Sequence, residues 1–148
     1  MDICRKYGVV PESMLPFRVD TLMYAGDENT FYASAAQYKA SAYFNLGKEL
    51  GQWRAWLASA GPIMAGVRVD ATWDAANATH GILDAFQPNT VRGGHAICIV
   101  GYDDKARLFK FKNSWSDKWG AKGYGYLPYD YMKKHLMDAW SARDRLHA

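Results

Sequence analysis

Cysteine is scarce in this sequence, which has only Cys4 and Cys98 among its 148 residues. Two thiols are too few for the disulfide framework that stabilises small secreted domains, so we expect both to be ordinary, partly buried side chains. No apolar run approaches the roughly 20 residues needed to cross a bilayer. The first residues also lack the apolar stretch of a signal peptide, although a chain cut from a longer precursor would look the same. We expect no membrane partner, and the localisation stays open.

An excess of charge of one sign is missing too. The 18 basic and 15 acidic residues leave a formal charge of only +3, and the nearest approach to a basic run is Lys133-Lys134-His135. Scattered charge of this kind indicates a solvated surface, so we expect no nucleic-acid partner. No set of His, Cys and acidic residues has the spacing of metal ligands. We therefore expect neither a metal nor a cofactor.

Aromatic residues, in contrast, are abundant: they make up 15% of the chain and include 6 Trp and 10 Tyr. They indicate a densely packed core or a cleft walled by rings, and composition alone does not choose between the two. A chain of 148 residues fits one domain, which would bury roughly 68–70% of its unfolded surface. We predict a single domain over residues 1–148.

Helical patterns dominate the first 60 residues. A short helix ends at Gly8, and a second is expected over residues 29–43. The clearest helix is expected over residues 47–59, because Leu46, Leu50, Trp53 and Leu57 recur at spacings that place them on one face. Gly61 and Pro62 then stop it.

Strand patterns dominate from residue 61 onward. A hairpin is expected from strands at 95–102 and 108–113 around a polar turn, because Phe109 and Phe111 alternate with Lys110 and Lys112. The other expected segments are a strand at 63–69, loops at 70–78 and 114–122, a strand at 123–127 and a short helix at 131–136. Helices followed by antiparallel strands predict an α+β fold.

The hairpin carries the residues with catalytic potential. His95 opens the first strand after Gly93-Gly94, where a ligand backbone can approach closely, and Asn113 ends the second strand. The start of one strand lies across from the end of the next, so the two side chains should be neighbours. An amide oxygen accepting from one ring nitrogen would orient the imidazole and free the other nitrogen for proton transfer. Taken alone, the pair could also be an unrelated strand-edge histidine and turn asparagine.

The pair stands within an ordered series of motifs that resembles the papain-like (C1) cysteine peptidases. The strong part runs through Gly93-Gly94-His95-Ala96-Ile97, Val100-Gly101-Tyr102, Lys112-Asn113-Ser114-Trp115, Trp119-Gly120 and Gly123-Tyr124-Gly125-Tyr126. Weaker similarities lie at residues 6–12, 61–64, 128–132 and 138–140. The resemblance implies the family's right-hand domain, an antiparallel β-barrel or sheet with flanking helices.

The resemblance also implies roles for individual residues. His95 would be the general base and acid, Asn113 would orient it, and Trp115 would shield their hydrogen bond. The substrate groove would be lined by Ala65, Gly66, Gly94 and Trp119, and the partner would be a peptide or protein substrate.

Two departures from the family pattern bear on activity. Ser116 stands where the family usually has glycine, which affects a loop and not the catalytic pair. More seriously, neither cysteine is followed by Trp as the family's nucleophile is, and the oxyanion-hole Gln has no counterpart. Cys98 lies three positions from His95 on one strand, so its side chain should point to the opposite face. We expect the left-hand, cysteine-bearing domain to be largely missing and the polypeptide to be inactive alone.

Three explanations remain open at this point. The sequence could be a truncated or processed portion of a peptidase, a non-catalytic pseudo-peptidase that binds proteins or peptides, or a generic α+β domain. The ordered motifs make the last improbable, and whether the polypeptide is an enzyme stays uncertain. The face that would pack on the left-hand domain should be apolar, so a complementary chain or a homo-oligomer is expected to cover it.

Overall fold

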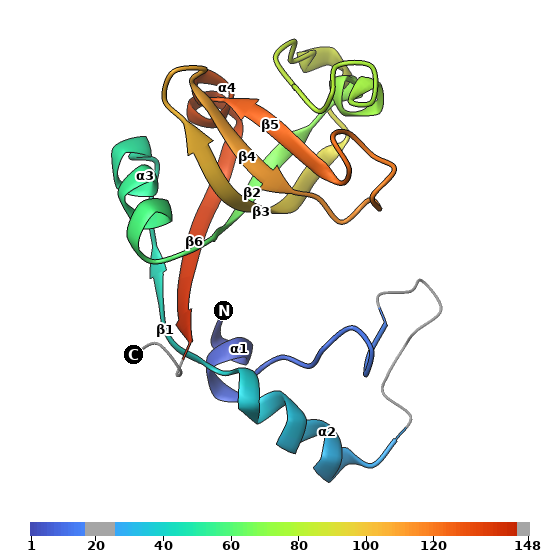
Figure 1. The fold of residues 1–148 in the computed structure, drawn as a ribbon, viewed down its shortest axis with the longest axis vertical. Coiled ribbons are helices and arrows are strands. Elements are labelled where there is room, and N and C mark those ends of the chain that lie inside the picture. Colours follow the sequence, from blue (N-terminus) through green and yellow to red (C-terminus); the bar gives the residue numbers. More distant parts are fainter. Residues whose placement is uncertain (17–25, 145–148) are drawn as a thin grey trace. The chain divides into compact units, whose positions relative to one another are not determined.

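A computed structural model describes residues 1–16 and 26–144 (Figure 1). The chain divides into two compact units, one formed by Met1–Phe44 with Ala142–Ala148 and the other by Asn45–Ser141. The prediction of a single domain stays a prediction. Within the described part, no helix is long and apolar enough to span a membrane.

The first unit contains short helices and the start of a strand. Its elements are α1 (Asp2–Lys6), α2 (Glu28–Ala35), the 3-10 turn η1 (Ala36–Tyr38) and most of β1 (Ala40–Asn45). The Asp27 carboxylate caps α2 by accepting the Thr30 N–H at 2.7 Å. Gly8 ends the first segment with a φ of 92°, and a Cβ there would stand 1.8 Å from the Ala35 carbonyl oxygen.

The helix expected over residues 29–43 is therefore wrong in its second half. The helical backbone ends by Tyr38, and the segment that follows is β1, an edge strand beside β6. Its sequence, Ala-Ser-Ala-Tyr-Phe-Asn, has no strong local preference that would exclude either structure. Residues 40–45 form a strand because they pair with β6, about 100 residues later in the chain. The local sequence carries no information about such a distant contact.

The second unit holds most of a six-stranded sheet in the order β1-β6-β2-β3-β4-β5. All the pairings from β6 through β5 are antiparallel. The elements are α3 (Leu50–Ser59), β2 (Ile63–Val69), η2 (Ala71–Ala75), η3 (Pro88–Thr90), β3 (Gly93–Asp103), β4 (Leu108–Lys112), β5 (Tyr124–Pro128), α4 (Tyr129–His135) and β6 (Leu136–Asp144). The predicted α+β architecture is confirmed.

The hydrophobic core lies between one face of the sheet and the helices that cover it. On β2, Ile63, Ala65 and Val67 are buried, while the alternate residues Met64 and Arg68 are exposed. The predicted stripe of the third helix is also confirmed as core, since Leu50 and Trp53 are buried and Leu46 and Leu57 pack beside them.

The strands expected from residue 61 onward are confirmed with small shifts at their ends. The turn between β3 and β4 is held by Asp103, whose carboxylate accepts the Ala106 N–H at 2.8 Å. One strand escaped prediction: β6 pairs with β2 in the interior of the sheet, and a one-residue irregularity between Gly66 and Val67 marks that pairing.

Candidate active site

The β3–β4 hairpin brings the two predicted catalytic side chains together. His95 lies near the start of β3, and Asn113 directly follows β4. The Nε2 atom of His95 lies 2.8 Å from the Oδ1 atom of Asn113. The prediction that these two side chains are neighbours is confirmed.

A second hydrogen bond fixes which end of the Asn113 amide faces the ring. The Oδ1 atom also accepts the backbone N–H of Ser114 at 2.8 Å, so it is the oxygen that faces both donors. His95 must then carry its proton on Nε2, which leaves Nδ1 as the nitrogen with a free lone pair. An imidazole in this tautomer can accept a proton at Nδ1 while the amide holds the ring.

The Asn113 side chain is 8% exposed, and its Nδ2 atom has no hydrogen-bond partner within the described part of the chain. Burial keeps water from competing for Oδ1, which strengthens the bond to the imidazole.

Two tryptophans contact the imidazole ring. Trp115 lies with its ring centroid 4.8 Å from that of His95 and tilted by 32°, and it is 38% exposed. Trp73 meets the same imidazole edge-on at 5.7 Å and is fully buried. One ring therefore borders the imidazole on the solvent side and the other on the core side.

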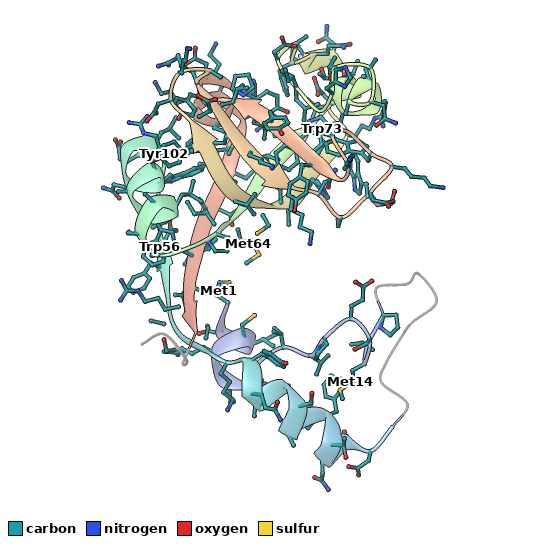
Figure 2. All side chains as sticks on the ribbon, in the orientation of Figure 1. Met1, Met14, Trp56, Met64, Trp73 and Tyr102 are labelled. Carbon is teal, nitrogen blue, oxygen red and sulfur yellow. The ribbon has the colours of Figure 1, made fainter. Side chains whose placement is uncertain are left out.

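Sequence reasoning missed Trp73, which it left in a loop of small polar residues. The structure places it at the centre of an aromatic cluster, near the end of the sheet where η2 lies (Figure 2). It contacts Trp115 at 5.6 Å and stacks on Trp119 at 5.8 Å, and its backbone carbonyl accepts the Trp119 Nε1–H at 3.0 Å. The sequence did contain a signal that Trp73 is buried: it is a large apolar residue among Ala, Asn and Asp, and such a residue is seldom exposed to solvent.

The residues predicted to line a groove divide between the two faces of the sheet. Gly66 and Gly94 lie on its open face. Ala65 is 1% exposed and belongs to the core, so its side chain does not reach that face. Trp119 is partly buried against the core beside Phe111.

Cys98, the cysteine in the same compact unit, is not a partner of this histidine. Cys98 alternates with Ile97 and Ile99, which share the core face with His95, and so its side chain lies on the opposite face. Burial raises the pKa of the Cys98 thiol. Cys4 belongs to α1 in the other compact unit. Across residues 1–16 and 26–144, no three His, Cys or acidic side chains are grouped as metal ligands would be.

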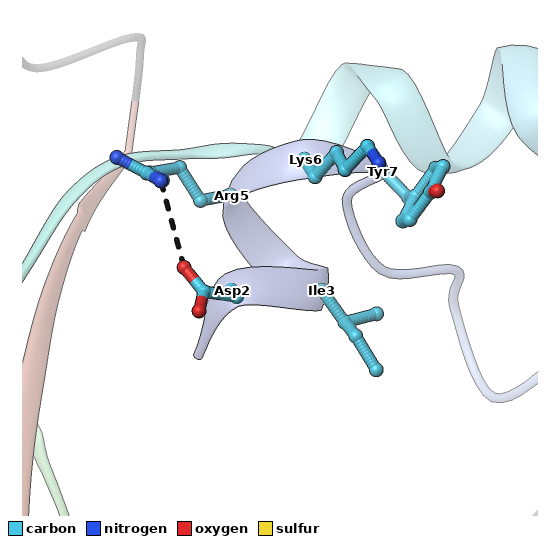
Figure 3. Close-up of a pocket in the computed structure, with 5 residues that line it drawn as sticks. All are labelled: Asp2, Ile3, Arg5, Lys6 and Tyr7. Carbon is cyan, nitrogen blue, oxygen red and sulfur yellow. Dashed lines mark ion pairs between the residues drawn. The ribbon is translucent and has the colours of Figure 1, made fainter.

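A separate hollow lies at α1, lined by Asp2, Ile3, Arg5, Lys6 and Tyr7 (Figure 3). All five residues come from about two turns of one short helical segment, and Arg5 is paired with Asp2 at 3.5 Å. This is a surface depression between neighbouring side chains, and nothing in it resembles a reactive group.

Comparison with known proteins identifies the family to which this arrangement belongs. The pattern of the papain family of cysteine proteases matches residues 1–139. The chain belongs to the papain family. Its mixed α+β fold is the papain-like fold: the crystal structure of xylellain, a cysteine protease from Xylella fastidiosa, superposes with a TM-score of 0.79 and 28% identity.

The curated relatives of this chain are matched over only part of their length. Cathepsin F of Mus musculus is 31% identical over 114 residues, which is 73% of this chain and 24% of cathepsin F. Gamete and mating-type specific protein A of Dictyostelium discoideum is 33% identical over 117 residues, 79% of this chain and 24% of that protein. The xylellain superposition covers 96% of this chain and 59% of xylellain.

Proposed function

We propose that these 148 residues are the histidine- and asparagine-bearing portion of a papain-like cysteine peptidase, corresponding to its right-hand domain. The observation that carries the proposal is the 2.8 Å contact between His95 Nε2 and Asn113 Oδ1. In this proposal His95 is the general base and acid, Asn113 orients its ring, and Trp115 shields their hydrogen bond. The substrate would be a peptide or protein.

The chemistry follows from the tautomer. With the proton on Nε2 held by Asn113, the Nδ1 lone pair can remove the proton from a thiol placed beside it. The thiolate would attack the scissile carbonyl, and the imidazolium would return the proton to the leaving amine. Gly66, Gly94 and Trp119 are the groove residues retained in the proposal. The buried position of the Ala65 side chain argues against direct contact with substrate.

We propose further that this polypeptide alone does not hydrolyse peptides. Thiol catalysis needs a sulfur within reach of Nδ1, and the Cys98 side chain lies on the other face of the sheet. No oxyanion-hole Gln has a counterpart in the sequence, and losing one such donor costs about 3 kcal/mol of transition-state stabilisation. Activity would require a segment that supplies both Cys and Gln.

The alternative is a pseudo-peptidase that binds a peptide or protein without cleaving it. The observation favouring it is that several large apolar side chains of the second unit are exposed: Met64, Val100, Tyr102, Trp115 and Met137 are each 37–57% exposed. Surface of this kind is commonly covered by a partner. Either a complementary chain or a second copy could cover it.

Complementation tests the peptidase proposal directly. The chain is mixed or co-expressed with the part of xylellain that carries its catalytic cysteine, and hydrolysis of a fluorogenic peptide is followed with and without a thiol-reactive epoxide. We expect no turnover by the chain alone and epoxide-sensitive turnover by the mixture. His95→Ala should abolish that turnover, whereas Cys98→Ala, on the same strand but the opposite face, should leave it unchanged.

Two results would count against the proposal. Epoxide-sensitive turnover by the isolated chain would disprove its inactivity. A mixture that forms a stable complex but gives no turnover would favour the pseudo-peptidase. Light scattering of the isolated chain tests the partner proposal, since a monomer at all concentrations would show that no second copy covers the apolar surface.

A further inference from the structure

Met137 is a residue of β6 that has no register partner in the neighbouring strand β2. On one side of it, Asp138 lies opposite Gly66. The next register pair joins Leu136 to Val67, so Met137 is the extra residue of a β-bulge. Met137 and Asp138 are consecutive and both exposed, whereas side chains of a regular strand alternate between the two faces. The bulge thus turns an additional side chain of β6 away from the core.

The Met137 side chain lies across two glycines of the neighbouring strands. Its Cβ is 3.6 Å from where a Cβ on Gly66 would stand, and its Sδ is 2.8 Å from where a Cβ on Gly94 would stand. Both glycines face the open side of the sheet, so the thioether crosses β2 and ends over the residue that precedes His95. A side chain at Gly94 would collide with this sulfur, and the missing Cβ makes room for it.

The second unit contains three methionines, and Met137 is the most exposed of them. Its exposed fraction is 57%, compared with 44% for Met64 and 0% for Met132. Met64 projects from the same open face (Figure 2), but it lies opposite Cys98, four residues along β3 from Gly94. An oxidant dissolved in water therefore reaches the sulfur of Met137 most readily, and Met137 alone covers the strand next to His95.

We propose that Met137 is an oxidation site: a hydroperoxide converts its thioether to a sulfoxide, and peptide binding on the open face weakens until the sulfoxide is reduced. The inference rests on the proposed function, because it uses a peptide bound beside His95. In the reaction with hydrogen peroxide, the sulfur attacks one peroxide oxygen, and the S–O bond forms as the O–O bond breaks. The sulfur loses two electrons, and the second oxygen leaves as water with both protons.

Oxidation weakens binding because it adds a polar group to an apolar surface. The surface around the sulfur is formed by Gly66, Gly94 and Ala96, which offer no polar side chain. The sulfur lies against Gly94, so the new oxygen points toward solvent and becomes a hydrogen-bond acceptor. A peptide side chain that packs on the thioether would have to cover this acceptor, and covering it without a donor costs free energy.

The test treats the full chain, carrying Cys4→Ala and Cys98→Ala to remove both thiols, with hydrogen peroxide. Peptide mapping by mass spectrometry follows sulfoxide formation, and we expect Met137 to be oxidised first and Met132 to stay unmodified in the folded protein. Peroxide is then removed, and binding of a blocked pentapeptide with a central leucine is measured by NMR titration. The affinity should be about fivefold weaker after oxidation. Methionine sulfoxide reductase with dithiothreitol should restore it.

Two matched variants separate Met137 from the other methionines. Leucine is close to methionine in size but has no sulfur, so Met137→Leu should have the same affinity before and after peroxide treatment. Met64→Leu removes the other exposed thioether of the open face. Its affinity should still fall about fivefold on oxidation, because Met137 remains.

Each outcome decides the inference. Oxidation of Met132 before Met137 overturns it, and so does an unchanged affinity once Met137 is oxidised, which leaves peptide binding intact. A loss of affinity on oxidation of Met137→Leu would place the effect elsewhere and also overturn it. Failure of the untreated chain to bind the peptide overturns it together with the proposed groove. A reversible loss that depends on Met137, in a chain that fails the complementation assay, supports the inference and counts against the peptidase proposal alone.

Discussion

The indole Nε1–H of Trp73 donates to the hydroxyl of Tyr131 at 3.1 Å, although the two residues are 58 positions apart. The Tyr131 hydroxyl in turn donates to the Arg68 carbonyl at 2.7 Å. These two hydrogen bonds connect Trp73 to α4 and, through Tyr131, to β2. Trp73 in turn contacts the His95 imidazole from the core side. The surroundings of the His95–Asn113 pair thus depend on a tyrosine outside the hairpin.

Replacing Tyr131 with Phe should destabilise the protein by about 1–3 kcal/mol. The change leaves the buried Trp73 N–H and the Arg68 carbonyl without their partner. Chemical denaturation measures the loss. Tyr38→Phe is the matched control, because Tyr38 is 52% exposed, and it should change stability by no more than about 0.5 kcal/mol. Equal effects of the two substitutions would contradict the role assigned to the Tyr131 hydroxyl.

The same tyrosine predicts a loss of stability in alkali. Burial raises the pKa of Tyr131 to about 12, from an ordinary value of 10.0. The unfolded chain loses this proton first, so the contribution of Tyr131 to stability is intact below pH 10 and declines as the pH rises toward 12. The pKa values of Tyr43 and Tyr129 are raised as well, so ultraviolet titration should show a late-ionising component that becomes smaller by one tyrosine in Tyr131→Phe. A titration curve that is unchanged by the substitution would disprove the assignment.

Replacing Asn113 with Ala should release the His95 ring. The imidazole loses the acceptor that holds its proton on Nε2, so nitrogen NMR should change from one dominant tautomer to a mixture. The cost in stability should be about 0.5–1.5 kcal/mol. Asn89→Ala, an exposed residue in η3, is the control and should leave the His95 signals unchanged. A single Nε2–H tautomer in Asn113→Ala would show that something else orients the ring.

Replacing Gly125 with Ala should disturb the packing beneath the aromatic cluster. A Cβ at this position would stand 2.3 Å from the Phe111 ring and 3.0 Å from Trp119. Such overpacking typically costs about 1–3 kcal/mol. Gly101→Ala is the matched control, since nothing lies within 4 Å of its Cβ position, and its effect should stay within about 1 kcal/mol. Similar denaturation midpoints for the two variants would contradict this packing argument.

Alkylation of Cys98 should be slow at neutral pH. Burial raises the pKa of the thiol, so less thiolate is present at a given pH than for an unburied cysteine. In a Cys4→Ala background, the rate of reaction with iodoacetamide should rise at a higher pH than the rate for N-acetylcysteine amide. Mass spectrometry follows the reaction. If Cys98 reacted at neutral pH as fast as N-acetylcysteine amide, its thiol would be activated. Cys98 would then again be a candidate nucleophile.

The hairpin that carries His95 and Asn113 could be predicted because its determinants are local. The alternation of Phe109 and Phe111 with lysines fixes which face of β4 is buried, and the short polar turn fixes which residues lie opposite one another. These two features place His95 and Asn113 at the same end of the hairpin, and the register irregularity between Ile99 and Gly101 brings Asn113 onto the face of β3 that carries His95. The position of Cys98 on the opposite face could be predicted in the same way, because it is an odd number of residues from His95 on one strand.

Contacts between distant segments could not be predicted from the sequence. The sequence by itself determined four strands (β2, β3, β4 and β5), the third helix and the placement of His95 and Asn113 at one end of the hairpin, since each depends on spacing along a continuous segment. Only the tertiary structure decided that residues 40–45 form a strand, that Trp73 contacts the imidazole, and that β6 pairs with β2. Those arrangements depend on which segments pair and pack, and that is settled by burial and hydrogen bonding summed over the whole sheet.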